Sequence, residues 1–410
     1  MTGSGTFTPR QSFLAALRYP AYRYLWGSAV AMGAASSIEM LAVGWLVLEI
    51  TDSPSMVGLV AALRWVGMGF GPFFGILADR FDRRHTIIVL RLAGSGYALA
   101  LAVLYFTSLL AAWQIFILVL IGGTLNAYDF TTSNTIVPDT TESQNLSSAV
   151  GLMMSGVSIS RMVGPLVGGY LFDRLGAGGT FSTIAVLYLV TSAIITPMRI
   201  AGRPRLSHPE PIWRSLTGGV RQVVSDRTLL ALIIMAAVAN LFVFPVVFGI
   251  MPVFVRDVLH AEASGLGQLM AIEGLGGLIG ALAIMALGKS RHKGSLVFLT
   301  LVTWAVFLGI FSGSRLFPVS LMLLAGAGLG RGLTFGMIQL LLLTWAPEEI
   351  RGRVMGLRIF AVVTMPLGSI LMGVGADLWG VATVILVSTM SCILVTALFA
   401  FLIPELRRRQ

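Results

Sequence analysis

Residues 75–84 read Gly-Ile-Leu-Ala-Asp-Arg-Phe-Asp-Arg-Arg, and they lie between two apolar runs that are each long enough to cross a bilayer. Acidic and basic side chains this close together cannot lie in hydrocarbon, so the stretch marks a membrane–water boundary. Because basic loops stay on the cytoplasmic side, this boundary is predicted to face the cytoplasm. The predicted orientation and the span count of the whole chain follow from this assignment.

Composition places the chain among membrane proteins. Hydrophobic residues make up 56% of its 410 residues and charged residues only 11%, whereas soluble domains carry about 25% charged residues. Repeated apolar stretches of about 20 residues predict a polytopic helical membrane protein. The net charge of +10 is scattered over short loops, which favours membrane topology over nucleic-acid binding. The single cysteine, Cys392, excludes an intramolecular disulfide.

Twelve spans are predicted, arranged as two six-helix bundles in an all-α membrane fold. Their ranges are 23–50, 55–78, 86–107, 113–137, 145–171, 178–198, 228–255, 264–288, 294–313, 318–345, 353–377 and 380–403. The predicted organisation is a cytoplasmic segment 1–22, an N-terminal bundle 23–198, a linker 199–227, a C-terminal bundle 228–403 and a basic tail 404–410. In the linker, apolar residues from Ile212 to Val223 recur at helical spacing, which predicts an amphipathic helix at the inner membrane surface.

The distribution of basic residues predicts the orientation. With the N-terminus inside, cytoplasmic segments contain 22 of the 28 basic residues, among them Arg91, while three lie in outside loops and three inside spans. Both termini are therefore predicted to be cytoplasmic. The expected location is the plasma membrane, which in bacteria is the inner membrane.

The two bundles also resemble each other in sequence. A shift of 209 residues aligns several features, namely Gly58 with Gly267, Arg64 with Glu273, and the loop 80–84 with 289–293. Two parallel repeats with a substrate site at their interface are a transporter architecture.

The span count, the central linker and the motif Gly75-x-x-x-Asp79-Arg80-x-Asp82-Arg83-Arg84 resemble the major facilitator superfamily. The motif matches the signature loop G-x-x-x-D-R-x-G-R-R of that superfamily, with Asp82 in the place of glycine. Further stretches, including Ala127-Tyr128-Asp129 and Arg351-Gly352-Arg353, resemble the branch that contains enterobactin exporters and related efflux proteins. The resemblance covers nearly the whole chain.

The resemblance implies a cytoplasmic gate. Asp79 would pair with basic residues at the start of the eleventh span and so latch the two halves together. The predicted gate residues are Gly75, Asp79, Arg80, Arg83, Arg84, Arg353 and Arg358. Gly75 is expected to let the second helix approach a neighbour closely. The alternative is that the arginines only fix the topology and bind lipid phosphates.

A second motif lies in the fifth span and resembles the antiporter motif of superfamily exporters. Its residues are Gly151, Gly164, Pro165, Gly168 and Gly169, with Ser160 where a glycine is usual. Small residues every four positions form a smooth strip along one helix face, which allows tight packing. The proline is expected to bend the helix. Ordinary small-residue packing is the alternative interpretation.

Six ionisable residues fall inside predicted spans, where such residues mark functional sites by default. They are Glu39, Arg64, Asp129, Arg161, Glu273 and Arg331. In the superfamily, helices 1, 2, 4, 5, 7, 8, 10 and 11 line the central cavity, so the resemblance places all six on cavity helices and none on helices 3, 6, 9 or 12. Similar depths in the membrane allow Glu39 to pair with Arg64.

A proton-coupled exporter needs a carboxylate that can exchange a proton, and Asp129 and Glu39 are the predicted coupling residues, with Glu273 third. Arg161 is expected to compete for such a carboxylate or to contact an anionic substrate. The other predicted cavity residues are Arg64, Arg331, Asn126 and Tyr128, and Asn126 shares a polar stripe with Asp129 and Ser133. The opposing interpretation is that all six charges form static ion pairs between helices.

Together these features favour a secondary active transporter that exports amphiphilic small molecules, either drugs or a siderophore, by alternating access. A proton gradient would supply the energy, and no cofactor or metal is expected. A lipid or lysophospholipid flippase on the same fold is the alternative. An enzyme is disfavoured because the four histidines lie in loops without metal-ligand spacing, and a non-transporting receptor would not need six buried charges. The expected form is a monomer whose partners are its substrate, protons and membrane lipids rather than nucleic acid.

Overall fold

A computed structural model describes residues 14–199, 226–287, 293–347, 354, 356 and 361–403. The described elements are all helices, and nine of them are long and apolar enough to cross a membrane. The predicted linker helix and the basic tail 404–410 lie outside the described residues.

The N-terminal half consists of six helices. They are α1 (Pro20–Thr51), α2 (Pro54–Val66), α3 (Gly71–Arg80), α4 (Arg83–Phe106), α5 (Ala112–Ile136) and α6 (Leu146–Ile195). A single 3-10 turn, Gly67–Phe70, joins α2 to α3, so the two form one span. The 50-residue helix α6 turns at Gly176 and contains two spans.

The C-terminal half follows the same plan. Its helices are α8 (Arg227–Val238), α9 (Met251–Asp257), α10 (Ala263–Leu287), α11 (Lys293–Ser312), α12 (Phe317–Trp345), α14 (Thr364–Trp379) and α15 (Val381–Leu402). Two π-helical turns, Ala239–Val243 and Val246–Ile250, flank Pro245 and join α8 to α9 in one span. Counting α6 twice and adding the α2–α3 and α14 spans to the nine long helices gives the predicted twelve.

Local sequence explains where these helices begin and turn. Pro20 and Pro54 open α1 and α2, because proline is preset for the first helical turn and the amide that it lacks would be unpaired there. The chain turns with positive φ at Gly176 (66°) and Gly380 (82°), conformations that favour glycine because it has no side chain. Non-helical backbone within α6 therefore lies at Gly176 rather than at Pro165.

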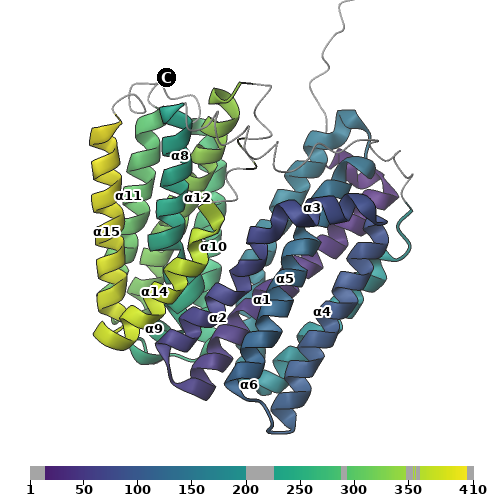
Figure 1. The fold of residues 1–410 in the computed structure, drawn as a ribbon, viewed down its shortest axis with the longest axis horizontal. Helices are drawn as coiled ribbons and strands as arrows, with labels where there is room; N and C mark the ends of the chain where they lie inside the picture. Colours follow the sequence, from purple (N-terminus) through teal and green to yellow (C-terminus); the bar gives the residue numbers. More distant parts are fainter. Residues whose placement is uncertain are drawn as a thin grey trace, which may run out of the picture.

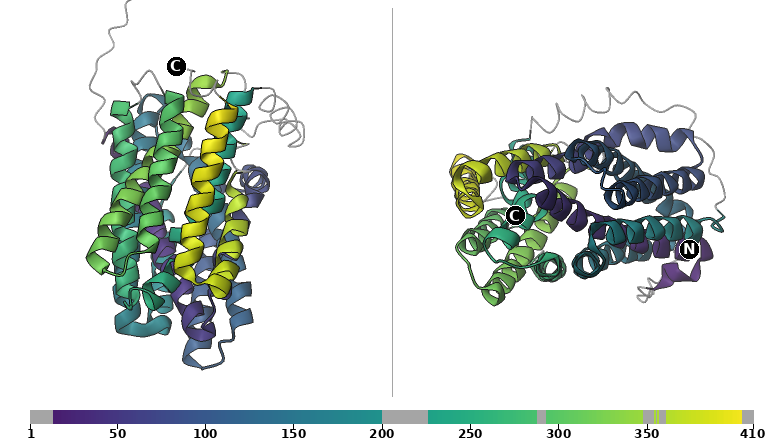
Figure 2. Two further views of the ribbon diagram at one scale, coloured as in Figure 1. Left: turned by 90° about the vertical axis from the view of Figure 1, so that its left-hand side faces the viewer. Right: turned by 90° about the horizontal axis from the view of Figure 1, so that it is seen from below.

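The two halves are separate bundles that meet at one end (Figure 1). They lie close together at the lower end of that view, where α2, α9 and the start of α10 lie, and they diverge toward the end that carries the C-terminus. The view from below in Figure 2 shows the same two groups of helices. We call the end with loops 52–53 and 258–262 the closed end and the opposite end the open end.

Two glycine-lined crossings hold the halves together. In the α2–α14 crossing, a Cβ atom on Gly58 would lie 2.4 Å from the Ser369 carbonyl oxygen and 2.9 Å from Cα of Gly373. In the α6–α10 crossing, a Cβ on Gly267 would lie 2.3 Å from the Pro165 carbonyl oxygen. Gly58 and Gly267 are the pair that the 209-residue shift aligns. The internal repeat therefore places equivalent glycines at equivalent crossings.

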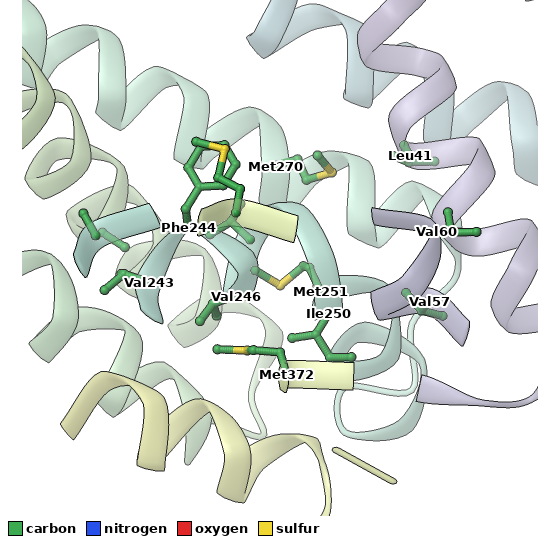
Figure 3. Close-up of a cluster of buried hydrophobic side chains, with 14 of the residues drawn as sticks. Leu41, Val57, Val60, Val243, Phe244, Val246, Ile250, Met251, Met270 and Met372 are labelled. Atoms are coloured by element: carbon green, nitrogen blue, oxygen red, sulfur yellow. The ribbon is translucent and has the colours of Figure 1, made fainter. Parts of the chain in front are cut away.

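A large apolar cluster continues from these crossings into both halves (Figure 3). Leu41 and Val57 of the N-terminal half belong to the same cluster as Ile250, Met251 and Met270 of the C-terminal half. Between the halves, α1 and α2 together with the π-helical turn Val246–Ile250, α9 and α10 line a space of about 400 Å³ with open solvent included. The closed end therefore has an apolar floor beneath that space.

Candidate functional site

The first predicted pair of charges is present in the N-terminal half. Glu39 of α1 forms an ion pair with Arg64 of α2, and its second carboxylate oxygen accepts a 2.5 Å hydrogen bond from the Tyr188 hydroxyl. Arg64 also donates to the carbonyl and hydroxyl oxygens of Ser36, each at 2.9 Å. Asn126 donates to the same hydroxyl at 2.7 Å. The Glu39 carboxylate, which is fully buried, is thus held from two sides.

The partner of Asp129 is Arg91 of α4, which the sequence analysis wrongly assigned to the cytoplasmic segments. The Arg91 guanidinium is completely buried and its Nε lies 3.0 Å from Asp129 Oδ1. Its Nη1 donates to the Ser28 hydroxyl and to the Thr191 carbonyl oxygen. Charged residues are therefore not confined to the expected cavity helices, since α4 is the third span. Arg91 lies five residues inside the predicted span 86–107, and counting charges by span would have found it.

Asp129 is the buried carboxylate that borders a cavity within the N-terminal half. The cavity is bounded by α1, α4, α5 and α6, and its volume is about 490 Å³ with open solvent included. Arg91, Asn126, Asp129 and Ser133 line it, and Ser133 lies 3.4 Å from Asp129 Oδ2. The predicted polar stripe on α5 is confirmed, and it faces this cavity.

The C-terminal half contains one buried ion pair among its described residues, between Glu273 of α10 and Arg331 of α12. The contact is bidentate, with Nε donating to one carboxylate oxygen and Nη2 to the other at 3.2 Å. The Arg331 guanidinium also lies over the Phe248 ring, 5.8 Å from its centroid. A Cβ on Gly277 would lie 2.3 Å from Arg331 Nη2, so this glycine provides the room for the guanidinium.

Arg161 lies on α6 where that helix meets α10 of the opposite half. It is deep in the protein and within electrostatic range of Glu273 and Arg331, yet its side chain is exposed. That combination is typical of a side chain that lines an internal space. Within the described part of the chain Arg161 forms no ion pair or hydrogen bond through its side chain.

Tyr128, which the sequence analysis placed in the cavity, faces the other way. Its ring stacks on Phe74 of α3, with centroids 5.0 Å apart, and its hydroxyl contacts Thr86 of α4. Two residues along a helix correspond to about 200°, so Tyr128 and Asn126 occupy opposite faces of α5. The prediction for Tyr128 is therefore wrong, whereas Asn126 does line the cavity.

Two of the predicted gate arginines contact residues of their own half of the molecule. Arg83 pairs with Asp139 at 2.7 Å and Arg84 donates to the Thr196 carbonyl oxygen, so both bind within their own half. Asp82, which replaces the signature glycine, caps α4 by accepting a 2.7 Å bond from the His85 amide. The predicted close approach at Gly75 is absent, since a Cβ atom there would meet no described atom within 4 Å. The halves diverge at this end of the molecule (Figure 1).

The predicted latch between Asp79 and the eleventh span involves residues outside the described part of the chain. The side chain of Asp79 and the residues Arg353 and Arg358 lie outside what the structure describes. Arg80 belongs to the last turn of α3. The latch stays a prediction.

The residues of the antiporter motif line two different faces of α6. A Cβ atom on Gly164 would lie 2.6 Å from Ser37 Cβ of α1, and a Cβ atom on Gly168 would lie 3.1 Å from Ile38 Cα of the same helix. A Cβ on Gly169 would lie 2.3 Å from the Ala263 carbonyl oxygen of α10. The further motif residues are Pro165, whose carbonyl faces Gly267, Gly151, whose carbonyl accepts from Ser155, and Ser160, which donates to the Val30 carbonyl oxygen at 2.8 Å. The motif thus packs one helix against both halves.

At the closed end, two carboxylates bond helix N-termini of the opposite half. Asp173 of α6 accepts hydrogen bonds from the backbone amides of Ala263 (3.1 Å) and Ser264 (3.0 Å) at the start of α10. Asp377 of α14 accepts one from the Ser55 amide at the start of α2 (3.0 Å) and one from the Ser55 hydroxyl. Carboxylates in this position satisfy amides that the helix leaves unpaired and interact favourably with its dipole.

An exposed ion pair also joins the two halves at the closed end. Arg256 of α9 lies 2.6 Å from Asp52, which follows α1, and donates to the Leu48 carbonyl oxygen at 3.2 Å. Exposed pairs contribute little to stability. The two helix caps are therefore the stronger polar contacts between the halves at this end.

Comparison with known proteins agrees with this architecture. A family model described as transmembrane secretion effector matches residues 11–409. The multidrug efflux pump Tap of Mycolicibacterium fortuitum is 25% identical over 390 residues, which cover 93% of this chain and 95% of Tap. The enterobactin exporter EntS of Shigella flexneri is 28% identical over 372 residues, which cover 87% of this chain and 85% of EntS.

A solved structure shows the same fold. It is the crystal structure of a bacterial homologue of the human lysosomal transporter Spinster, in an inward-facing and unoccupied conformation. The TM-score is 0.74 at 13% identity, over 98% of this chain and 99% of that chain. Because the family model spans nearly the whole sequence and the relatives are transporters rather than enzymes, the chain belongs to the transmembrane secretion effector family of the major facilitator superfamily.

Proposed function

We propose that this transporter is a proton-coupled exporter of amphiphilic small molecules that works by alternating access in the bacterial inner membrane. The distribution of basic residues supports a cytoplasmic location for both termini, so that the open end faces the cytoplasm. The names of the relatives support drugs or a siderophore as the cargo. On this proposal, the proton gradient is the energy source and the working unit is the monomer.

The observation that carries the proposal is the Arg91–Asp129 ion pair at the wall of a cavity. Glu39 and Glu273 are each enclosed by their own arginine, with 0% and 2% of their surface exposed, whereas Asp129 keeps 4% and lines the cavity. Asp129 is therefore the carboxylate that a proton reaches most directly. Protonation would remove the counter-charge of Arg91, which is bonded to α1 and α6 as well. A proton at Asp129 would thus change contacts among four helices.

Gradient-driven transport by Asp129→Asn tests this role. In everted vesicles, whose lumen corresponds to the outside of the cell, the wild type should concentrate at least one of two fluorescent amphiphiles, the cation ethidium or dansyl-undecanoic acid, when the lumen is acidic. Asp129→Asn cannot exchange the proton, so its gradient-driven uptake of that amphiphile should fall by at least about tenfold, equivalent to 1.4 kcal/mol, while binding of the amphiphile persists. The measurement is uptake with and without a protonophore.

Glu262→Gln is the matched control, because that carboxylate is exposed at the closed end and should not affect coupling. Wild-type proton coupling in Asp129→Asn would contradict the assignment. If the wild type showed no response to the gradient with any amphiphile, the exporter mechanism itself would be wrong.

A further inference from the structure

The central charges of the transporter do not balance. Three buried carboxylates are each paired with one arginine, and Arg161 is a fourth arginine with no acid of its own among the described residues. The described core therefore has one excess positive charge. A cation away from bulk water is costly unless an anion or hydrogen-bond acceptors compensate for it.

The nearest acid does not satisfy Arg161. Glu273 gives both carboxylate oxygens to Arg331, so its charge is already matched. Arg161 feels this pair from across the boundary between the halves, and its side chain remains exposed. It lies 15 residues into α6, about 22 Å from the start of that helix, which is close to mid-membrane. An anion that pairs with Arg161 would therefore come from outside the described chain.

The neighbouring surface suits an apolar body. The space between the halves, whose volume is about 400 Å³ with open solvent included, is lined by Met40, Met270 and Phe248 among other apolar residues. Met270 precedes Glu273 by about one helical turn on α10, and Phe248 contacts Arg331, so this space continues toward the ion pair that faces Arg161. Methionine side chains adapt to irregular apolar shapes.

We propose that Arg161 binds an acidic group of the transported molecule, so that the central site takes amphiphiles in which one carboxylate or phosphate is attached to an apolar body. This inference rests on the proposed exporter function and specifies its substrate class. A guanidinium recognises both acidic groups through paired, charge-assisted hydrogen bonds. The acidic group would enter between the halves and restore neutrality next to the Glu273–Arg331 pair.

Binding measurements in nanodiscs test the proposal with two probes that differ only in charge, dansyl-undecanoic acid and its methyl ester. The wild type should bind the acid at least about tenfold more tightly than the ester, the effect of 1.4 kcal/mol. Arg161→Gln should bind both equally, and Arg161→Lys should keep most of the preference because it keeps the charge. Arg174→Gln is the matched control. It removes a charge from the same helix, at an arginine that lies over the Tyr170 ring, and it should behave like the wild type.

Competition identifies the source of the acidic group. Displacement of the probe by dodecanoate but not by lysophosphatidylglycerol supports a free carboxylate, and the converse supports a lipid phosphate. Equal binding of acid and ester by the wild type, or an unchanged preference in Arg161→Gln, would overturn the proposal. Binding needs no gradient, so gradient-driven transport of either amphiphile without any acid preference in binding contradicts only the role of Arg161. An acid preference without gradient-driven transport contradicts only the exporter proposal.

Discussion

The Arg91–Asp129 pair is the contact that joins most helices in the described N-terminal half. Arg91 lies on α4 and Asp129 on α5, and the same guanidinium bonds Ser28 of α1 and Thr191 of α6. In an apolar interior each charge is tolerated only because the other compensates for it. Removing one partner is therefore expected to cost far more than removing both.

Arg91→Met tests that dependence. The single variant leaves Asp129 as a buried, uncompensated charge and is expected to lose about 3–5 kcal/mol of stability. The double variant Arg91→Met with Asp129→Asn removes both charges and should recover most of that loss. Thermal unfolding in detergent measures both, with Arg174→Met as the exposed control. A double variant that is less stable than Arg91→Met would show that the pair does not act as a unit.

At the scale of single residues, sequence patterns locate the charges better than their partners. Depth alone pairs Glu39 correctly with Arg64, because adjacent spans place residues of equal depth side by side. Depth and polarity also single out Asp129 but miss Arg91, because a loop tally assigns an arginine near a helix start to the cytoplasm. Tyr128 is misplaced because its neighbour Asp129 faces the cavity, and hydropathy does not reveal which face a tyrosine occupies.

At the scale of helices, the closed end is held by a symmetric exchange of caps. The two capping carboxylates, Asp173 and Asp377, are 204 residues apart in the sequence, and so are Gly169 and Gly373. The serines that the two carboxylates bond, Ser264 and Ser55, are 209 residues apart, which is the spacing of the predicted repeat. Each half thus caps one helix of the other. The internal repeat predicts equivalent helices, but not that their ends bond across the boundary.

Removing both caps should open the closed end. A single helix cap is worth about 0.5–2 kcal/mol, so Asp173→Ala with Asp377→Ala should shift the population of open molecules severalfold. Spin labels at Leu109→Cys and Arg315→Cys, one on each half, report the distance between the halves at the closed end. Pulsed electron paramagnetic resonance measures it in a Cys392→Ser background. The double variant is expected to show a longer distance component.

Asp82→Ala is the matched control for that experiment, because it removes a cap that stays within one half and should leave the distances unchanged. Identical distance distributions in the wild type and in the double cap variant would show that the apolar crossings alone hold this end closed.

Helix positions are predictable to within a few residues, whereas helix irregularities are not. The predicted span 228–255 corresponds to α8 through α9, which cover Arg227–Asp257, because long apolar runs have few alternative structures in a membrane. The π-helical turns around Pro245 leave no sequence signal beyond the proline. They depend on packing, such as the 2.8 Å bond from Asn240 to the Ala361 carbonyl oxygen.

At the scale of the whole molecule, the two ends of the boundary between the halves are in opposite states. Two glycine crossings, two caps and an apolar floor close one end, while at the other end a Cβ atom on Gly75 would meet no described atom within 4 Å. On the proposed alternating-access mechanism these states exchange, so that the halves would separate at the caps and approach each other at Gly75. The glycine in the signature loop is then needed in the opposite state of the transporter.

Gly75→Trp is expected to separate these two states. A Cβ atom on Gly75 would meet no described atom within 4 Å in the present state, so we expect folding and binding of dansyl-undecanoic acid to be retained. The indole should block the approach of the halves at the open end. Transport is then expected to fall by at least about tenfold, which a destabilisation of the other state by 1.4 kcal/mol suffices to produce.

Gly96→Trp is the control for bulk alone, because that position on α4 is exposed and a Cβ atom there, as at Gly75, would meet no described atom within 4 Å, yet α4 forms neither of the two glycine crossings between the halves. Its transport should match the wild type. If Gly75→Trp transports normally while Gly96→Trp does too, the open end does not close at the signature loop. If Gly75→Trp binds the probe but does not transport it, while Gly96→Trp does both, another part of the protein packs against Gly75 during the transport cycle. The signature loop then acts as a contact surface of the closed gate.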